Sequence, residues 1–190
     1  MLIYRAVPLK TFVNNKRIVR HPGQRLPGNI PYLVDNLWEF ARPDAAPSRR
    51  HAVYASPTPE LALENALLPN TSAGDYLVCQ VAFERPAPKI QLSVKDARWH
   101  PDVAKLQRAV NAEVAPWVDI ELSKRLAIAP LFMPGATKAD FAAAVDGNPE
   151  LAYILLQVSA LVTLWRDEPA PNGELFFELT GDNAYRLTRI

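Results

Sequence analysis

The chain has 190 residues, a formal net charge of +1 and a single cysteine, Cys79. This length suits one domain that buries a core without disulfide staples, and the near-neutral charge excludes the electrostatics typical of a duplex nucleic-acid binder. The lone cysteine excludes an internal disulfide, and its alternating apolar surroundings predict a buried structural thiol.

Neither a membrane span nor a secretory signal is expected. The longest apolar stretch, 151–165, is too short to cross a bilayer comfortably and carries Gln157 and Ser159, so it predicts a buried helix. The first residues read as a strand and lack a basic segment followed by an apolar run. We therefore expect a cytoplasmic protein without a membrane partner. Delivery into another cell would require a non-classical route.

Positive charge gathers in the first part of the chain. Residues 1–50 hold nine Lys or Arg and three acidic residues, a net charge of +6, which leaves −5 for the remainder. This asymmetry suggests a site for an anionic ligand in the first part, and a solvated basic face is the alternative.

Prolines divide the first half into short elements without a flexible linker. In chain order the pattern predicts a strand at 2–6, a helix at 32–41, a strand at 51–55, a helix at 60–68, a strand at 75–83 and a continuation of the sheet at 89–92. The start of the helix at 60–68 is well marked, because Thr58 can cap it and Pro59 suits the first helical position.

The second half changes from helices back to strands. The pattern predicts helices at 102–114, 117–128, 138–145 and 149–165, and then a β-hairpin formed by 174–179 and 185–190 around Gly181. Strands at both ends with helices between them imply an α+β fold, in which both ends of the chain build the sheet. We expect a single domain, 1–190, with a helical insertion or cap at about 100–168.

Three polar features stand apart from this packing pattern. Arg5 lies within an apolar strand, where a guanidinium needs an anionic or hydrogen-bonding partner and suits a bidentate grip on phosphate. The alternative is that Arg5 simply alternates with its apolar neighbours along the strand and faces water.

The turn from Tyr54 through Ser56 to Thr58 puts hydroxyls where a helix begins, so it can hold a dinucleotide or merely cap that helix.

The third feature is a pair of carboxylates on the late strand. Glu174, Phe176 and Glu178 share one face of that strand. A carboxylate there can bond a ribose hydroxyl and stabilise an oxocarbenium-like transition state. A solvated sheet edge is the alternative.

The order of an arginine, a hydroxyl-rich turn and a late glutamate resembles the Arg-Ser-Glu class of the ADP-ribosyltransferase superfamily, the cholera-toxin-like group. The pieces that carry the resemblance are Tyr4-Arg5-Ala6, Asn36-Leu37-Trp38-Glu39, Ser56-Pro57-Thr58, the strand Tyr76 to Phe83, Glu174 with its apolar run, and Tyr185-Arg186-Leu187. They cover roughly residues 2–92 and 170–190 and leave the helical block unexplained.

The resemblance implies split mixed β-sheets around an NAD cleft. In that cleft Arg5 would hold the phosphates or ribose of NAD, and Ser56 and Thr58 would brace the site. Tyr54 or Trp38 would stack on nicotinamide or adenine, and Glu174 would be the catalytic carboxylate with Glu178 in reserve. The resemblance further implies a toxin or effector that transfers ADP-ribose to a macromolecular acceptor such as a protein, and a cognate antitoxin or immunity protein as a partner.

Two departures from the family pattern keep other functions open. The position two residues before Glu174 is Asn172, where the family usually has a second glutamate, so hydrolysis or phosphorolysis of NAD is an alternative to transfer. Pro57 replaces a threonine in the middle motif, and small toxin–antitoxin relatives fit this strand nearly as well. A binding protein that keeps the fold without turnover is the third possibility.

Other chemistries have little support in the sequence. The three histidines, His21, His51 and His100, show no metal-binding spacing with the lone cysteine, so we expect no metal. Neither a phosphate-binding glycine-rich loop nor a Gly-x-Ser-x-Gly elbow occurs.

Overall fold

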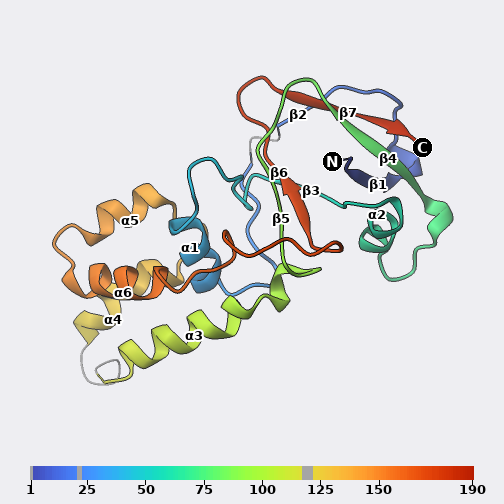
Figure 1. Cartoon of the computed structure of the whole chain (residues 1–190). Coiled ribbons are helices and arrows are strands. Elements are labelled where there is room, and N and C mark those ends of the chain that lie inside the picture. The colour runs from blue at the N-terminus through green and yellow to red at the C-terminus, as the bar shows by residue number, and fades with distance from the viewer. Residues whose placement is uncertain (1, 21–22, 117–121) are drawn as a thin grey trace. The chain divides into compact units, whose positions relative to one another are not determined.

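The computed structural model describes residues 2–20, 23–116 and 122–190 and shows an α+β protein (Figure 1). The chain divides into two compact units. The strand unit comprises Met1–Gly23, Ala45–Asp96 and Glu168–Ile190, and the helical unit comprises Gln24–Asp44 and Ala97–Asp167. The helical unit therefore takes in residues 24–44 as well as the block at about 100–168 that the sequence pattern singles out.

Two antiparallel sheets build the strand unit. One has the order β1-β4-β7-β2, formed by Tyr4–Pro8, Tyr76–Phe83, Ala184–Arg189 and Ile18–Val19. The other has the order β3-β6-β5, formed by Val53–Ala55, Leu175–Phe177 and Lys89–Gln91. Within the described residues all five strand pairings are antiparallel, so the expectation of mixed sheets is wrong there. Both ends of the chain contribute strands, as predicted.

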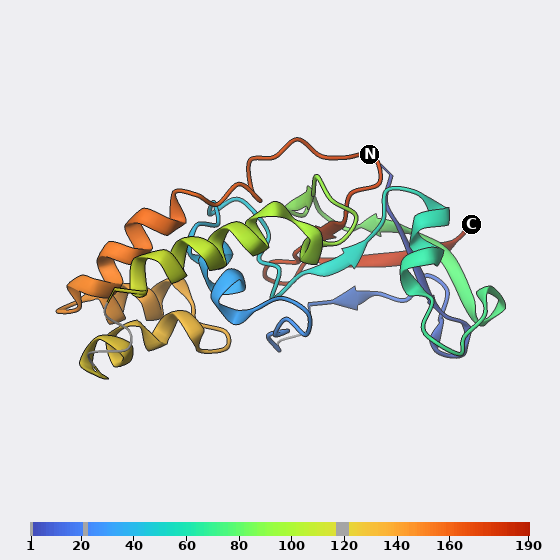
Figure 2. The same cartoon turned by 90° about the horizontal axis from the view of Figure 1, so that it is seen from below.

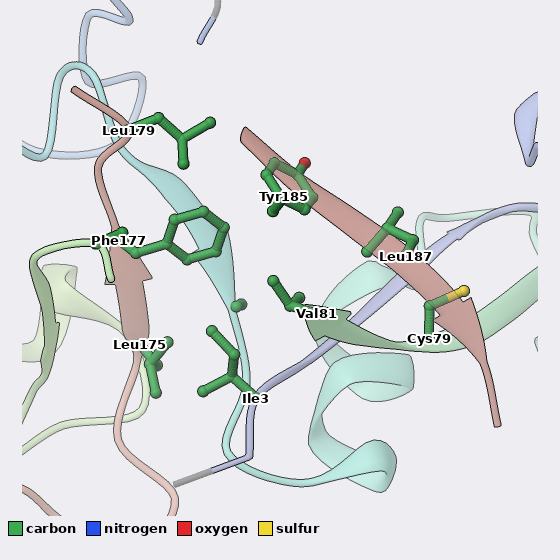
Figure 3. Close-up of a cluster of buried hydrophobic side chains, with 10 residues drawn as sticks. Ile3, Cys79, Val81, Leu175, Phe177, Leu179, Tyr185 and Leu187 are labelled. Carbon is green, nitrogen blue, oxygen red and sulfur yellow. The ribbon is translucent and has the colours of Figure 1, made fainter. Parts of the chain in front are cut away.

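The two sheets share one hydrophobic core. Figure 3 shows Phe177 and Leu179 across from Tyr185 and Leu187, which belong to the other sheet. The rings of Phe177 and Tyr185 meet edge to face at 5.3 Å between centroids, a favourable arrangement for aromatic pairs. Cys79 is fully buried in this core, which confirms the prediction of a structural thiol, and burial raises the pKa of its thiol.

The predicted hairpin at the C-terminal end is wrong. The chain does turn at Gly181, which has a φ of +59°, a value that glycine adopts readily. However, β6 pairs with β3 and β5, whereas β7 pairs with β4 and β2. The segment after β6 therefore carries the chain from one sheet to the other, because each strand finds its partners among strands distant in sequence.

Short helices complete the strand unit. Helix α2, Pro59–Ala66, packs against β1 and β4. The hydroxyl of Thr58 accepts a hydrogen bond from the N–H of Leu61 at 3.3 Å, and Pro59 occupies the first turn. This confirms the predicted helix start. The 3₁₀ turns η1, Leu9–Thr11, and η2, Ala73–Asp75, lie before β2 and β4.

Helices make up the helical unit (Figure 2). Its elements are α1 (Tyr32–Phe40), η3 (Ala97–Trp99), α3 (Pro101–Val114), α4 (Leu122–Ile128), η4 (Ala129–Phe132), α5 (Lys138–Val145) and α6 (Pro149–Ser159). Helix α1 packs against α3, α5 and α6. Residues 117–121 of the predicted helix 117–128 lie outside the described residues. Among the helices that the structure describes, none is long and apolar enough to cross a membrane.

A buried carboxylate organises the helical unit. Asp102, at the start of α3, is fully buried and accepts hydrogen bonds from the indole N–H of Trp38 at 3.1 Å and from the N–H groups of Thr163 at 2.9 Å and Leu164 at 3.0 Å. Because these two backbone donors bond Asp102, they are not used in helix α6. This explains why α6 ends at Ser159, six residues before the predicted end.

We predict that Asp102→Asn destabilises the protein by about 2–4 kcal/mol, because it weakens several charge-assisted bonds in a buried site. Burial alone raises the pKa of Asp102, but the N–H groups of Thr163 and Leu164 outweigh it and hold the pKa below its usual value. The stabilisation is therefore complete above pH about 4 and is lost as the pH falls through the lower folded-state pKa.

Urea unfolding of wild type and variant between pH 2 and 7 measures this effect. Asp44→Asn is the matched control, since Asp44 belongs to the same unit and pairs with Lys138 at an exposed position. The control should unfold like the wild type. An Asp102→Asn variant as stable as wild type at pH 7 would contradict the assigned role of this carboxylate.

Candidate functional site

The backbone around Glu174 is tightly fixed. Its N–H donates to the carbonyl of Val94 at 2.8 Å, and its carbonyl accepts from the N–H of Leu92 at 2.8 Å. The bond with Leu92 extends the pairing of β6 with β5 by one residue, and the bond with Val94 lies outside that register. The preceding residue, Gly173, lies so close to this strand that a Cβ atom there would be 1.8 Å from the carbonyl oxygen of Leu92. Glycine is therefore needed for this approach.

Ser56 and Glu174 flank the last residue pair of β3 with β6. Strand β3 pairs with β6 through Tyr54↔Phe176 and Ala55↔Leu175, so Ser56 directly follows this pairing and Glu174 directly precedes it. The hydroxyl oxygen of Ser56 accepts from the side chain of Asn65 at 3.2 Å.

Ser56 also joins the two sheets of the strand unit. It exchanges two backbone hydrogen bonds of 2.8 Å with Tyr4, the first residue of β1. Ser56 thus links the end of β3 to β1. Alternation puts Ser56 and Glu174 on the side opposite to Ala55 and Leu175, which face the core.

We call the side that carries Tyr54, Ser56, Glu174, Phe176 and Glu178 the Glu174 face. An arginine and two aromatic rings gather on it. The guanidinium of Arg49 lies 3.6 Å from the Glu174 carboxylate, 5.6 Å from the ring centroid of Tyr54 and 5.4 Å from that of Phe176. The side chains of Arg49 and Glu174 are only 10% and 16% exposed, so the ion pair is largely shielded from water.

Glu178, at the other end of β6, holds a loop. One of its carboxylate oxygens accepts from the N–H of Ser48 at 2.8 Å, and the other lies 3.7 Å from the guanidinium of Arg20. These contacts tie the segment before β3 to the end of β6. Glu178 is thus held by contacts with Ser48 and Arg20, whereas Glu174 is paired with Arg49.

Arg5 lies on the other side of the sheet. It follows Tyr4 on β1, and alternation turns it toward the side of Ile3, which is part of the core. There it donates a hydrogen bond to the hydroxyl of Tyr185, and its guanidinium lies 5.8 Å from the centroid of that ring. Burial raises the pKa of this tyrosine, and the charge of Arg5 opposes that rise. Ser56 and Glu174 thus lie on the Glu174 face, whereas Arg5 contacts Tyr185 in the core instead.

Two further predicted site residues are already engaged elsewhere. The hydroxyl of Thr58 caps α2. Trp38 belongs to the helical unit, where its ring is 1% exposed and its indole N–H bonds Asp102. Neither contact involves the Glu174 face.

Sequence reasoning missed Arg49 and Tyr4 as members of the site. Arg49 and Arg50 form a pair of basic residues directly before β3, which is the signal that could have singled them out. Tyr4 could have been identified only from the pairing of β1 with Ser56. In the sequence it lies in an apolar strand, where a tyrosine is expected to pack against the core.

Metal chemistry receives no support from the side chains that the structure describes. Among residues 2–20, 23–116 and 122–190, no group of three or more His, Cys, Asp or Glu is arranged to hold a metal ion. His21 lies outside these ranges.

Comparison with known proteins finds no match: no protein-family model, no curated protein and no solved structure is significantly similar to this chain. Inference about function therefore rests on the residues of the Glu174 face and their arrangement.

We predict that Gly173→Ala displaces Glu174 and destabilises the strand unit by at least about 2 kcal/mol, because the added methyl group would collide with the backbone of Leu92. Gly74→Ala is the control, since a Cβ there meets only the hydroxyl of Ser72 at 3.7 Å. Thermal unfolding of both variants measures the difference. Equal stability of the two variants would show that the approach of Gly173 to Leu92 is not required.

Proposed function

We propose that the strand unit is an NAD-dependent ADP-ribosyltransferase, with the fold of that superfamily, which breaks the nicotinamide–ribose bond at the Glu174 face. The observation that carries the proposal is the largely buried carboxylate of Glu174, with the Arg49 guanidinium 3.6 Å away and the rings of Tyr54 and Phe176 beside that guanidinium. A carboxylate, a hydroxyl, a cation and aromatic rings are the groups that a dinucleotide with a charged leaving group requires.

Glu174 acts on the ribose next to nicotinamide. Its carboxylate accepts a hydrogen bond from a ribose hydroxyl and stabilises the positive charge that develops at the anomeric carbon. The carbon–nitrogen bond breaks, and its electron pair leaves with neutral nicotinamide. A nucleophilic oxygen or nitrogen of the acceptor then bonds the anomeric carbon and gives its proton to water.

The neighbours of Glu174 bind and orient the dinucleotide. Ser56 braces the site from the end of β3, and Tyr54 offers a partly exposed ring for stacking on a base. Arg49 pairs with Glu174 and would meet the dinucleotide there, since a guanidinium suits phosphate as well as carboxylate. We propose a protein as the acceptor and a cognate antitoxin or immunity protein as the natural inhibitor.

Hydrolysis of NAD is the second candidate function, and Asn172 favours it. This residue stands two positions before Glu174 in an exposed turn, where Arg-Ser-Glu enzymes usually have a glutamate that activates the acceptor. Without that glutamate, water can take the place of the macromolecular acceptor. Labelled NAD added to a cell lysate separates the two functions: labelled macromolecules indicate transfer, and free ADP-ribose alone indicates hydrolysis.

We predict that Glu174→Gln lowers the rate of nicotinamide release at least about 100-fold, because the amide cannot stabilise the developing positive charge. Glu178→Gln is the matched control on the same strand and face, and it should reduce stability more than turnover. Chromatography of nicotinamide released from NAD measures both rates. The proposal fails if the wild type releases no nicotinamide, alone or with lysate, or if Glu174→Gln matches it.

The assignment of Arg5 to the phosphates of NAD remains a prediction with its own test. If Arg5 contacts NAD, Arg5→Ala raises KM for NAD at least about tenfold, since a charged contact is lost. Tyr185→Phe removes the hydroxyl that Arg5 contacts but keeps the charge, so it should leave KM nearly unchanged. The two substitutions could instead lower stability equally and leave KM unchanged. This result would show that Arg5 acts only through its contact between β1 and Tyr185.

A further inference from the structure

Helix α6 carries apolar residues on two opposite sides. Its inner side is buried in the helical unit and consists of Leu151, Ile154, Leu155 and Val158. Its solvent side carries Pro149, Tyr153, Leu156 and Ala160, spaced by four, three and four residues, which we call the outer stripe. Tyr153 is 53% exposed and Leu156 is 70% exposed. A helix with apolar residues on two opposite sides is normally covered on both of them.

The neighbouring helix α4 enlarges the exposed apolar surface. Helix α4 packs against α6, and its residues Leu122 and Leu126 are 69% and 65% exposed. They lie four residues apart and therefore share one side of α4. Four large apolar side chains on two contacting helices exceed the scattered exposure that is normal for a monomer surface.

The two ends of the outer stripe carry opposite charge. At its beginning lies a groove of about 270 Å³, lined by Glu113, Pro149, Glu150, Tyr153 and Ile154. Beyond its end lies the exposed Arg166, whose guanidinium is anchored on the carbonyl oxygens of Ala160 at 3.3 Å and Val162 at 2.6 Å. An antiparallel copy of the same helix would therefore bring a cation to each acidic groove.

We propose that a second copy of this chain covers the outer stripe, with the two α6 helices packed antiparallel around a two-fold axis. The spacing of the stripe reads the same in both directions. Tyr153 of each copy consequently meets Leu156 of the other, and Pro149 meets Ala160. Arg166 of each copy reaches Glu113 and Glu150 of the other, so one contact is made twice, as a two-fold interface requires.

The pairing also avoids unfavourable contacts along the flanks of the stripe. In an antiparallel arrangement the flank that carries Glu150 meets the same flank of the other copy. There Glu150 comes opposite Gln157, whose amide can donate to the carboxylate. This inference concerns association of the chain and is independent of the proposed NAD chemistry.

Sedimentation of the full chain over a wide concentration range tests the dimer. We expect a reversible monomer–dimer equilibrium, and Leu156→Glu should raise the dissociation constant at least about tenfold, because it puts a charge at the centre of the interface. The matched control is Leu68→Glu, since Leu68 is 64% exposed in the strand unit. A wild type that remains monomeric at about 1 mM, or equal effects of the two substitutions, would overturn the proposal.

A charge exchange tests the antiparallel register. Arg166→Glu and the double variant Glu113→Arg, Glu150→Arg should each dimerise more weakly than wild type, because each alone brings like charges together. Mixed in equal amounts, they should form a heterodimer as tight as the wild-type dimer, since every contact then joins opposite charges. Circular dichroism verifies that both variants fold. Absence of preferential heterodimer formation would contradict this pairing.

Discussion

The antiparallel pairing of β3 with β6 is the contact on which the candidate site depends. Its last pair, Ala55 with Leu175, is directly followed by Ser56 and directly preceded by Glu174, and two backbone bonds between Ser56 and Tyr4 join this point to β1. The core supports this register, because a shift by one residue would turn Leu175 outward and Glu174 inward. The same pairs that bury Ala55 and Leu175 in the core therefore place Glu174 on the opposite side of the sheet, where its side chain is 16% exposed.

The helical unit is organised by a different principle. Its central polar contact is a buried carboxylate, Asp102, which binds an indole and two backbone N–H groups from distant parts of the chain. A buried charge is tolerated there because each donor compensates for lost hydration. The apolar outer stripe of α6 lies on the side of the helix opposite to its buried residues, which is why we assign it to association.

Local patterns predicted most elements but not their partners. The cap at Thr58 and the alternating strand that contains Cys79 were correct because each depends on neighbouring residues. The predicted hairpin failed because pairing of β6 and β7 depends on strands far away in sequence. For the same reason the sequence indicated Ser56 and Glu174 as candidates, yet it could not reveal that Arg49 joins them and that Arg5 faces the opposite side.

The central claim is that NAD binds at the Glu174 face, and amide chemical-shift mapping tests it most directly. NAD is titrated into isotopically labelled Glu174→Gln protein, in which slow turnover keeps the dinucleotide intact. The account predicts saturable shifts centred on Ser56, on residue 174 and on Phe176, with little change along α6. Shifts confined to the helical unit, or no shifts at millimolar NAD, would contradict it.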